Sequence, residues 1–208
     1  SWQAGLDEVR DLLEAYDHPN IKRYAFERIS YQSSDYCFCP CTRERFHADT
    51  GGDLSTAKTS QVTAWKTERV GGLIAEYVRH IRGIRPDLLI GLHTQCAPGW
   101  GHDPARLKSY GIDEVLPHTV QFKESEASLH ALLGRLEPNP CILHFCTRDR
   151  RPANYDLWIK TPEIIGEVLA WIRHYPGANL AGLLFFNEPA TSPANKEAVY
   201  RNLEHFEW

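Results

Sequence analysis

Polar and ionisable side chains follow five short apolar segments of this sequence. Two carboxylates, Glu27 and Glu188, come directly after apolar residues, and Asp149 follows another apolar run. Such a pair suits glycoside hydrolysis, in which one carboxyl group is the general acid or base and the other the nucleophile or base. We expect both glutamates to be partly buried, which would raise the pKa of their carboxyl groups. The alternatives are ion pairing of Glu27 with Arg23 or Arg28, and a turn cap at Glu188.

Other polar and aromatic residues at the same places suit contacts with sugar hydroxyls and ring faces. We expect substrate contacts from eight of them, which are Arg28, Tyr31, His93, Trp100, His118, Gln121, His144 and Asn187. The three histidines follow successive apolar segments, and imidazole at such positions also suits zinc or iron. Both interpretations of the histidines stay open, as does a packing role for Trp100.

Three cysteines, Cys37, Cys39 and Cys41, lie two residues apart in a polar stretch. A closed structural zinc site needs four ligands, and no second cysteine pair completes one here. His47 or Cys96 would have to contribute. Zinc binding, free thiols and one local disulfide therefore remain open for this segment, and no cofactor is predicted.

The hydrophobic pattern predicts the elements that must position these residues. Apolar residues at helical spacing predict six helices, at residues 2–16, 62–84, 103–110, 124–136, 161–174 and 195–206. Short β-branched and aromatic runs predict five strands, at residues 21–31, 88–92, 114–120, 140–146 and 180–186. A polar, cysteine-bearing loop is predicted between the first strand and residue 60.

Alternation of nearly continuous apolar strands with helices indicates an α/β fold with a parallel sheet buried between helices. Five such units fit either an open doubly wound sheet or part of a (β/α)8 TIM barrel. No G-x-G-x-x-G or G-x-x-x-x-G-K loop follows any strand, which weakens the nucleotide-binding version of the open sheet. We expect one domain over residues 1–208, with the functional residues at the carboxyl ends of the strands.

Charge and hydropathy limit the partners that we expect. The 23 Lys and Arg residues against 27 Asp and Glu residues give a formal net charge of −4, so the chain lacks the basic surface of nucleic-acid-binding proteins. No apolar run approaches the roughly 20 residues of a transmembrane helix. We therefore expect a soluble chain with neither nucleic acid nor membrane as a partner. Its compartment, cytoplasmic or secreted, stays open.

Two segments resemble bacterial glycoside hydrolases with TIM-barrel domains. The run from Phe26 to Tyr31, followed by that from Tyr36 to Phe46, resembles a strand F-D-x-I-R-Y-P that leads into a C-x-C-x-x-C-x-x-x-F loop. The stretch from Gly101 to Gln121 is similar to the segment before the sixth strand of that group, which contains D-x-[IV]-x-P-x-x-Y.

The match departs from the group at several positions. Glu27 stands where the group has Asp, Ser30 replaces its Arg and Gln32 its Pro. Cys41 comes one residue before the group's third cysteine, a position that Thr42 occupies. Asn187-Glu188-Pro189 resembles the acid/base signature of the larger glycosidase clan, although that signature belongs to a fourth strand.

The resemblance implies that residues 22–29 are the fourth barrel strand and residues 180–186 the eighth. A full barrel takes about 250 residues, so we expect a partial barrel of about five βα units, strands four to eight. An N-terminal truncation would explain the shortfall. The open apolar edge is expected to be completed by a longer N-terminus or another chain, or to be covered.

The first functional hypothesis is a glycosidase that cleaves an oligosaccharide or glycoconjugate with Glu27 and Glu188, and with Asp149 as the substitute for either. Its partner would be a carbohydrate substrate, and it would need no cofactor. The second is a metal-dependent barrel hydrolase or isomerase that uses His93, His118 and His144. The third is a non-catalytic carbohydrate-binding module.

Overall fold

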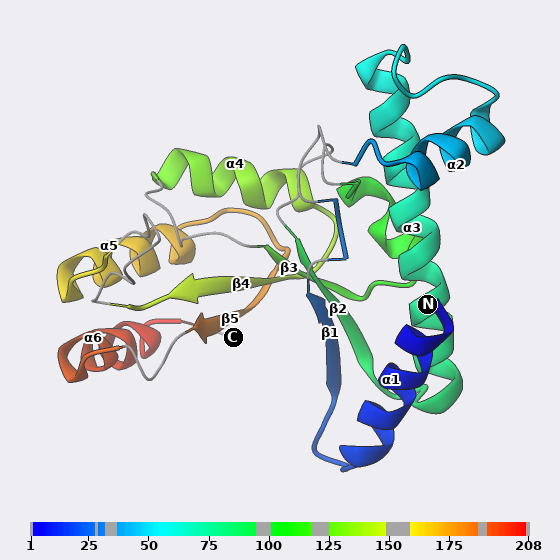
Figure 1. Cartoon of the computed structure of the whole chain (residues 1–208). Coiled ribbons are helices and arrows are strands. Elements are labelled where there is room, and N and C mark those ends of the chain that lie inside the picture. The colour runs from blue at the N-terminus through cyan, green and yellow to red at the C-terminus, as the bar shows by residue number, and fades with distance from the viewer. Residues whose placement is uncertain are drawn as a thin grey trace. The chain divides into compact units, whose positions relative to one another are not determined.

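The computed structural model describes residues 2–27, 29–31, 37–94, 101–117, 125–148, 159–186 and 191–206. The chain divides into two compact units, residues 1–114 and 115–208. The single-domain organisation stays a prediction. Figure 1 shows the order of the elements along the chain.

The first unit contains two strands and four helical segments. In chain order they are α1 (Trp2–Ala15), β1 (Arg23–Glu27), α2 (Pro40–Thr50), α3 (Thr59–Ile84), β2 (Leu89–Thr94) and the 3-10 helix η2 (Pro104–Tyr110). β1 and β2 are parallel, with Arg23 paired to Leu89 and Glu27 paired to His93. The predicted elements are present, although β1 is shorter than the predicted strand at both ends.

One prediction of secondary structure in this unit is wrong. The segment from Pro40 to Thr50 is the helix α2 and not part of a loop. The sequence pattern did not predict this helix because α2 buries only one residue, Phe46, so no apolar stripe recurs at helical spacing. The helix begins at Pro40, which suits a first helical position, and ends at Gly51 with a positive φ of 71°.

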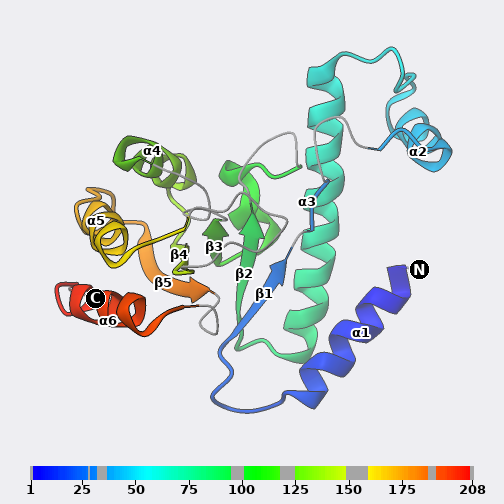
Figure 2. The ribbon, with the colours of Figure 1, turned by 60° about the vertical axis from the view of Figure 1, so that its left-hand side comes forward.

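Several elements of the first unit pack against the long helix α3. α1 and η2 both pack against it, and Figure 2 shows α1 alongside it. The ring of Tyr77 lies 5.7 Å from that of Phe26, which joins α3 to the buried face of β1. Near its first turns, Trp65 packs edge-on against Phe46 of α2 at 5.2 Å. One rigid helix thus contacts α1, α2 and β1.

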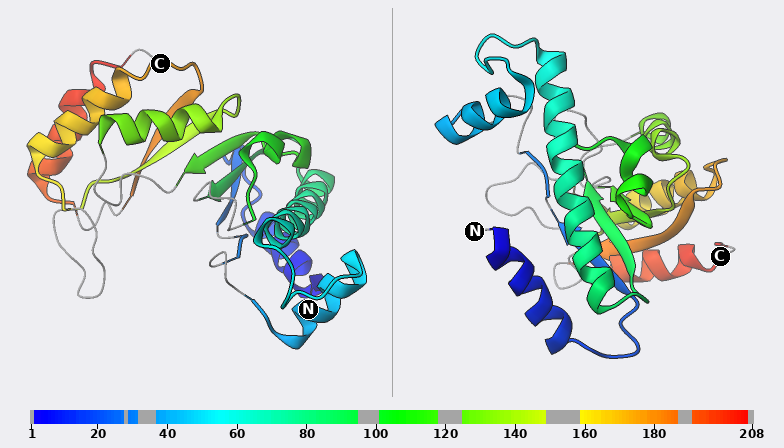
Figure 3. Two further views of the ribbon diagram at one scale, coloured as in Figure 1. Left: turned by 90° about the horizontal axis from the view of Figure 1, so that it is seen from above. Right: turned by 90° about the vertical axis from the view of Figure 1, so that its right-hand side faces the viewer.

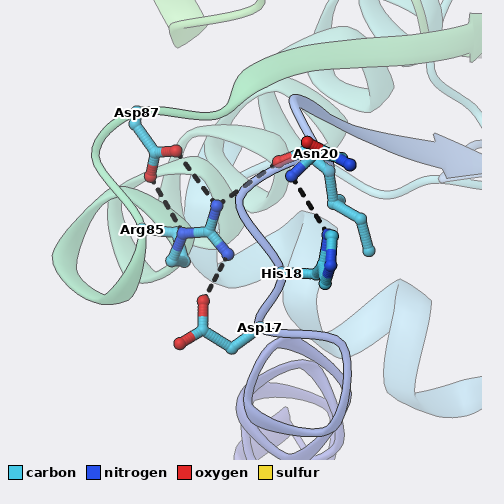
Figure 4. A network of polar contacts seen from close by, with 6 residues as sticks. Asp17, His18, Asn20, Arg85 and Asp87 are labelled. Atoms are coloured by element: carbon cyan, nitrogen blue, oxygen red, sulfur yellow. Dashed lines mark hydrogen bonds and ion pairs between the residues drawn. The ribbon is translucent and has the colours of Figure 1, made fainter.

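An arginine network ties together the segments that precede β1 and β2 (Figure 4). Arg85 donates to both carboxylate oxygens of Asp87, at 2.9 and 3.0 Å, and to Asp17 at 2.8 Å. Its guanidinium also donates to the carbonyl of Ile21 at 3.3 Å. Because Asp17 and Ile21 precede β1 and Asp87 precedes β2, this network holds the amino ends of the two strands in register.

The second unit continues the alternation of strand and helix. Its elements are β3 (Glu114–Pro117), α4 (Glu126–Leu136), β4 (Cys141–Cys146), α5 (Pro162–Arg173), β5 (Leu180–Phe186) and α6 (Pro193–Leu203). α4, α5 and α6 lie in a row along one side of these strands, as Figures 2 and 3 show. Each of these helices begins after a serine or threonine whose hydroxyl accepts a backbone N–H, which satisfies part of the helix terminus.

The five strands follow the order β1-β2-β3-β4-β5 in the sheet. The pairs β1 and β2, β3 and β4, and β4 and β5 are each parallel. A doubly wound sheet reverses its strand order at a switch point, whereas a barrel adds each strand beside the preceding one. The sequential order therefore favours the barrel type over the doubly wound sheet.

Within the described residues, no helix is both long and apolar enough to cross a membrane.

Two adjacent glycines of α3 should respond oppositely to a methyl group. A Cβ at Gly71 would lie 2.2 Å from the ring of Tyr110, whereas one at Gly72 would meet nothing within 4 Å. Gly72→Ala should raise the free energy of unfolding by about 0.5–1 kcal/mol, because alanine in a helix interior loses less backbone conformational entropy on folding than glycine does. Gly71→Ala should lower it by about 1–3 kcal/mol through overpacking. Urea titrations of both variants measure the difference, and equal shifts would contradict the packing described here.

The arginine network should add to the acid sensitivity of the fold. Arg85 lowers the pKa of Asp87 from 3.8 to about 2. The carboxylate therefore stabilises the folded state fully above about pH 4, and this contribution disappears as the pH falls towards 2. Asp87→Asn should lower the free energy of unfolding at pH 7 and make no difference near pH 2. Asp11→Asn, an exposed change on α1, is the control. A difference that does not vary with pH would contradict the role of this ion pair.

Candidate functional site

The carboxyl ends of β1 and β2 bring two predicted site residues together. Glu27 is the last residue of β1 and is paired in register with His93 of β2. Residues paired in this way project from the same face of a sheet. Glu27 is exposed and His93 is half-buried. The two strands thus present a carboxylate and an imidazole as neighbours at the end where parallel α/β folds place their catalytic groups.

Glu27 is exposed, so the expectation that it is partly buried is wrong. The side chains of β1 alternate, with Phe26 buried on the α3 side and Arg23, Ala25 and Glu27 exposed on the other. Sequence pattern shows this alternation but not which face is covered. Arg23, the predicted ion-pair partner, instead donates to Glu114 at 3.0 Å.

His93 titrates under two opposing influences. Burial lowers the pKa of its imidazole, and the negative charge of Glu27 raises it, with burial the stronger. The ring is therefore mostly neutral at pH 7. A neutral imidazole can donate one hydrogen bond and accept another, which suits the recognition of a hydroxyl group.

A second histidine near the same strand ends, His102, was missed by the sequence reasoning. It is 2 % exposed, and its Nε2 donates to the carbonyl of Ile29 at 2.7 Å. Its Nδ1 bonds to the hydroxyl of Thr94, the last residue of β2. Because a carbonyl only accepts, Nε2 carries the proton of the neutral ring and Thr94 donates to Nδ1. Burial also lowers the pKa of this imidazole.

His102 thereby joins the end of β2 to the segment that follows β1. The residue belongs to the Gly101 to Gln121 stretch of the resemblance, but no periodicity distinguishes it there. Gly101 has a positive φ of 87°, and a Cβ on it would lie 2.6 Å from Val70 of α3. A glycine before a histidine and a capping Asp103 is the signal that could have found this position.

Tyr31 follows β1 and lies beside part of α3. It lines a cavity of about 890 Å³ between residues 29–31 and the part of α3 from Glu68 to Tyr77. The buried ammonium group of Lys66 lies 4.9 Å from the centre of its ring. Burial raises the pKa of Tyr31. Neither Glu27 nor His93 lines this cavity, so the structure separates Tyr31 from the pair.

In the second unit, His144 lies on β4 and is only 3 % exposed. It is paired in register with Leu184 of β5, whose side chain is exposed. Its substrate contact therefore stays a prediction.

A buried amine just beyond the carboxyl end of β4 was missed by the sequence reasoning. Lys160 is 1 % exposed, and its ammonium group lies 5.6 Å from the centre of the Phe145 ring. Burial lowers the pKa of Lys160 to about 8, against a smaller opposing effect of Cys146. The amide of Asn195 donates to the carbonyls of Thr147 and Lys160, at 3.0 and 2.9 Å, and holds this segment in place. No periodicity predicts this burial, because the contacts come from separate segments.

Seven predicted site residues lie outside the part of the chain that the structure describes, and their roles stay predictions. They are Arg28, Trp100, His118, Gln121, Asp149, Asn187 and Glu188.

The cysteine segment lies at the start of α2. Cys37 is half-buried, and Cys39 and Cys41 are exposed. His47, one proposed fourth ligand, bonds through Nδ1 to the carbonyl of Gly52 at 3.1 Å. Cys96, the other, is not among the described residues. Of the side chains that the structure describes, no three from His, Cys, Asp and Glu are placed to hold a metal ion together.

Comparison with known proteins gives a similarity of fold. No protein-family model matches the chain, and no curated protein does either. Among solved structures, the chain is similar to bee venom hyaluronidase in complex with a hyaluronic acid tetramer, with 9 % identity over 99 % of this chain and 74 % of that chain, and a TM-score of 0.53. A chitinase from Chromobacterium violaceum shares 10 % identity over 89 % of this chain and 91 % of that one, with a TM-score of 0.46.

The chain has a partial (β/α)8-barrel fold. The sequential parallel strands and the similarity to the hyaluronidase agree on this point, and the predicted fold class is confirmed. The fold places Glu27 and His93 at the end of the strands where barrel enzymes carry their active sites. Residue-level correspondence does not follow from 9 % identity.

The pairing of Glu27 with His93 predicts a measurable change in titration. Glu27→Gln removes the negative charge that favours the imidazolium form, so the pKa of His93 should fall further below its usual value of 6.5. Titration of the His93 ring protons by NMR measures this shift. Glu14→Gln, an exposed change on α1, is the control and should leave the titration unaltered. A pKa of His93 that stays constant in Glu27→Gln would mean that the two groups do not interact.

Proposed function

We propose that this protein is a glycoside hydrolase that acts on an oligosaccharide or glycoconjugate. The observation that carries the proposal is the register pairing of Glu27 with His93 at the carboxyl ends of β1 and β2. The fold supports it, because it is similar to that of a hyaluronidase. Because no family model matches the chain, the assignment rests on the chemistry of the site.

Glu27 is proposed as one of the two catalytic carboxylates. Its exposed side chain can reach a bound sugar, and the neutral imidazole of His93 beside it can bond a sugar hydroxyl. Glu188 is proposed as the second carboxylate, with Asp149 as the substitute for either. Hydrolysis by a carboxylate pair uses only water as the second reactant, so we propose no cofactor.

The remaining predicted contacts belong to the same proposal. The side chains proposed to bind substrate are Arg28, Tyr31, His93, Trp100, His118, Gln121, His144 and Asn187. We also propose that a further N-terminal segment or another chain completes or covers the edge of the barrel beside β1. The proposed binding partner is a carbohydrate substrate.

Turnover of defined glycans tests the proposal. The whole chain is incubated with a panel of oligosaccharides that includes hyaluronan fragments, since the similar hyaluronidase was crystallised with a hyaluronic acid tetramer. Reducing-end release is then measured. Glu27→Gln and Glu188→Gln should each lower kcat by roughly 10²-fold or more, the effect expected for loss of an acid–base group. Glu14→Gln is the matched control and should retain full turnover.

Each alternative has its own outcome in this assay. Unchanged turnover in both glutamine variants would contradict the carboxylate mechanism. Glycan binding without hydrolysis would indicate a non-catalytic carbohydrate-binding module. Activity that disappears with a chelator and returns with zinc or iron would indicate a metal-dependent hydrolase or isomerase instead.

A further inference from the structure

Two cysteine sulfurs meet just before α2. The Cys37 thiol donates to Cys39 Sγ at 3.1 Å, and the hydroxyl of Thr42 lies 3.1 Å from Cys39 Sγ and 3.4 Å from Cys37 Sγ. Cys39 is exposed, so reagents in solution can reach it. The sequence left a local bridge, zinc and free thiols open, and the structure now shows which two cysteines are in contact.

The position of Cys39 favours its thiolate. It is the residue before the first turn of α2, a helix terminus that favours a negative charge. Hydrogen bonds from the side chains of Thr42 and Cys37, with smaller ones from the backbone, lower the pKa of Cys39 from 9.0 to about 7. A large fraction of Cys39 is therefore ionised at neutral pH, and the thiolate is the reactive form of cysteine.

A packed support holds this pair in place. Phe46 of α2 belongs to a buried cluster with Leu54, Val62 and Trp65, which fixes α2 against the first turns of α3. Trp65 also donates through Nε1 to Asp49 of α2 at 2.9 Å. The two cysteines therefore directly precede a helix that is anchored to α3.

We propose that Cys37 and Cys39 form a redox-active dithiol that exchanges with small-molecule disulfides. Cys39 is the attacking residue because it is exposed and lies at the helix terminus. Cys37 is the resolving residue because its sulfur is already in contact with that of Cys39. A disulfide bond is about 2.05 Å long, so closure brings the two sulfurs about 1 Å closer than they are.

The exchange has two steps. The Cys39 thiolate attacks one sulfur of the disulfide, for example oxidised glutathione, and forms a mixed disulfide while one thiolate leaves and takes up a proton. Cys37 then gives its proton to solvent and attacks Cys39 Sγ, which expels the second thiolate. The two cysteines lose two electrons in total, and the small disulfide is reduced to two thiols.

Mass spectrometry of the whole chain tests the assignment. The protein is fully reduced, mixed with oxidised glutathione at pH 7, and trapped with an alkylating agent at successive times. The native chain should lose two hydrogens as the disulfide between Cys37 and Cys39 forms. Cys37→Ser should stop at the mixed disulfide on Cys39, because the resolving thiol is missing. Cys39→Ser should react roughly tenfold more slowly, since it removes the thiolate that these hydrogen bonds stabilise.

Two further variants guard against an indirect effect. Cys41→Ser changes the third cysteine of the segment, which lies beyond the contact, and should behave like the native chain. Thr42→Val removes a hydroxyl without touching a cysteine, so the midpoint of the rate against pH should move upward from about 7.

Three results would overturn the proposal. Glutathione could attach equally to Cys37, Cys39 and Cys41, or the mixed disulfide of the native chain could persist without resolution. Stoichiometric zinc in the purified protein, released when the thiols are modified, would show that the cysteines are metal ligands instead. None of these results bears on glycan hydrolysis, so the two proposals stand or fall separately.

Discussion

The register of β1 against β2 is the constraint on which the candidate site depends. Parallel pairing with side chains on alternate faces means that a shift of one residue moves every side chain of a strand to the opposite face. Arg85 opposes such a shift from one end, because its single guanidinium bonds the segments before both strands. His102 joins the other end, through Thr94 and the carbonyl of Ile29. These contacts hold both ends of the β1–β2 pair, which keeps Glu27 in register with His93.

The two ends of these strands use polar groups differently. At the amino end, charged pairs are partly exposed and their geometry serves to position the backbone. At the carboxyl ends in both units, polar groups are buried at a cost in desolvation that their hydrogen bonds must offset. His102 and Lys160 are two examples, and burial lowers the pKa of each. Such costs are typical of functional ends of a barrel, where stability is exchanged for chemistry.

Sequence patterns predicted the elements better than the surroundings of their side chains. Residues 180–186 are the strand β5 as expected from a continuous apolar run between turn signals, but Ala181 and Leu184 are exposed, so the run predicted the strand and not its burial. α2 was not predicted because it buries only Phe46, and a helical pattern needs several apolar positions. Contacts such as that of Lys160 with Phe145 join residues far apart in sequence, which no local pattern encodes. The second carboxylate, Glu188 or Asp149, rests on sequence alone.

The length of α3 has a consequence for how the first unit can diverge. Its 26 residues span about 39 Å at 1.5 Å per residue. The cluster that anchors α2 lies on its first turns, whereas Arg85 follows its last. Because these contacts stand at opposite ends of the helix, we expect substitutions between the cysteines and Ala57 to leave the strand register unchanged. The cysteine-bearing segment is thus a module that evolution can alter while the barrel strands stay aligned.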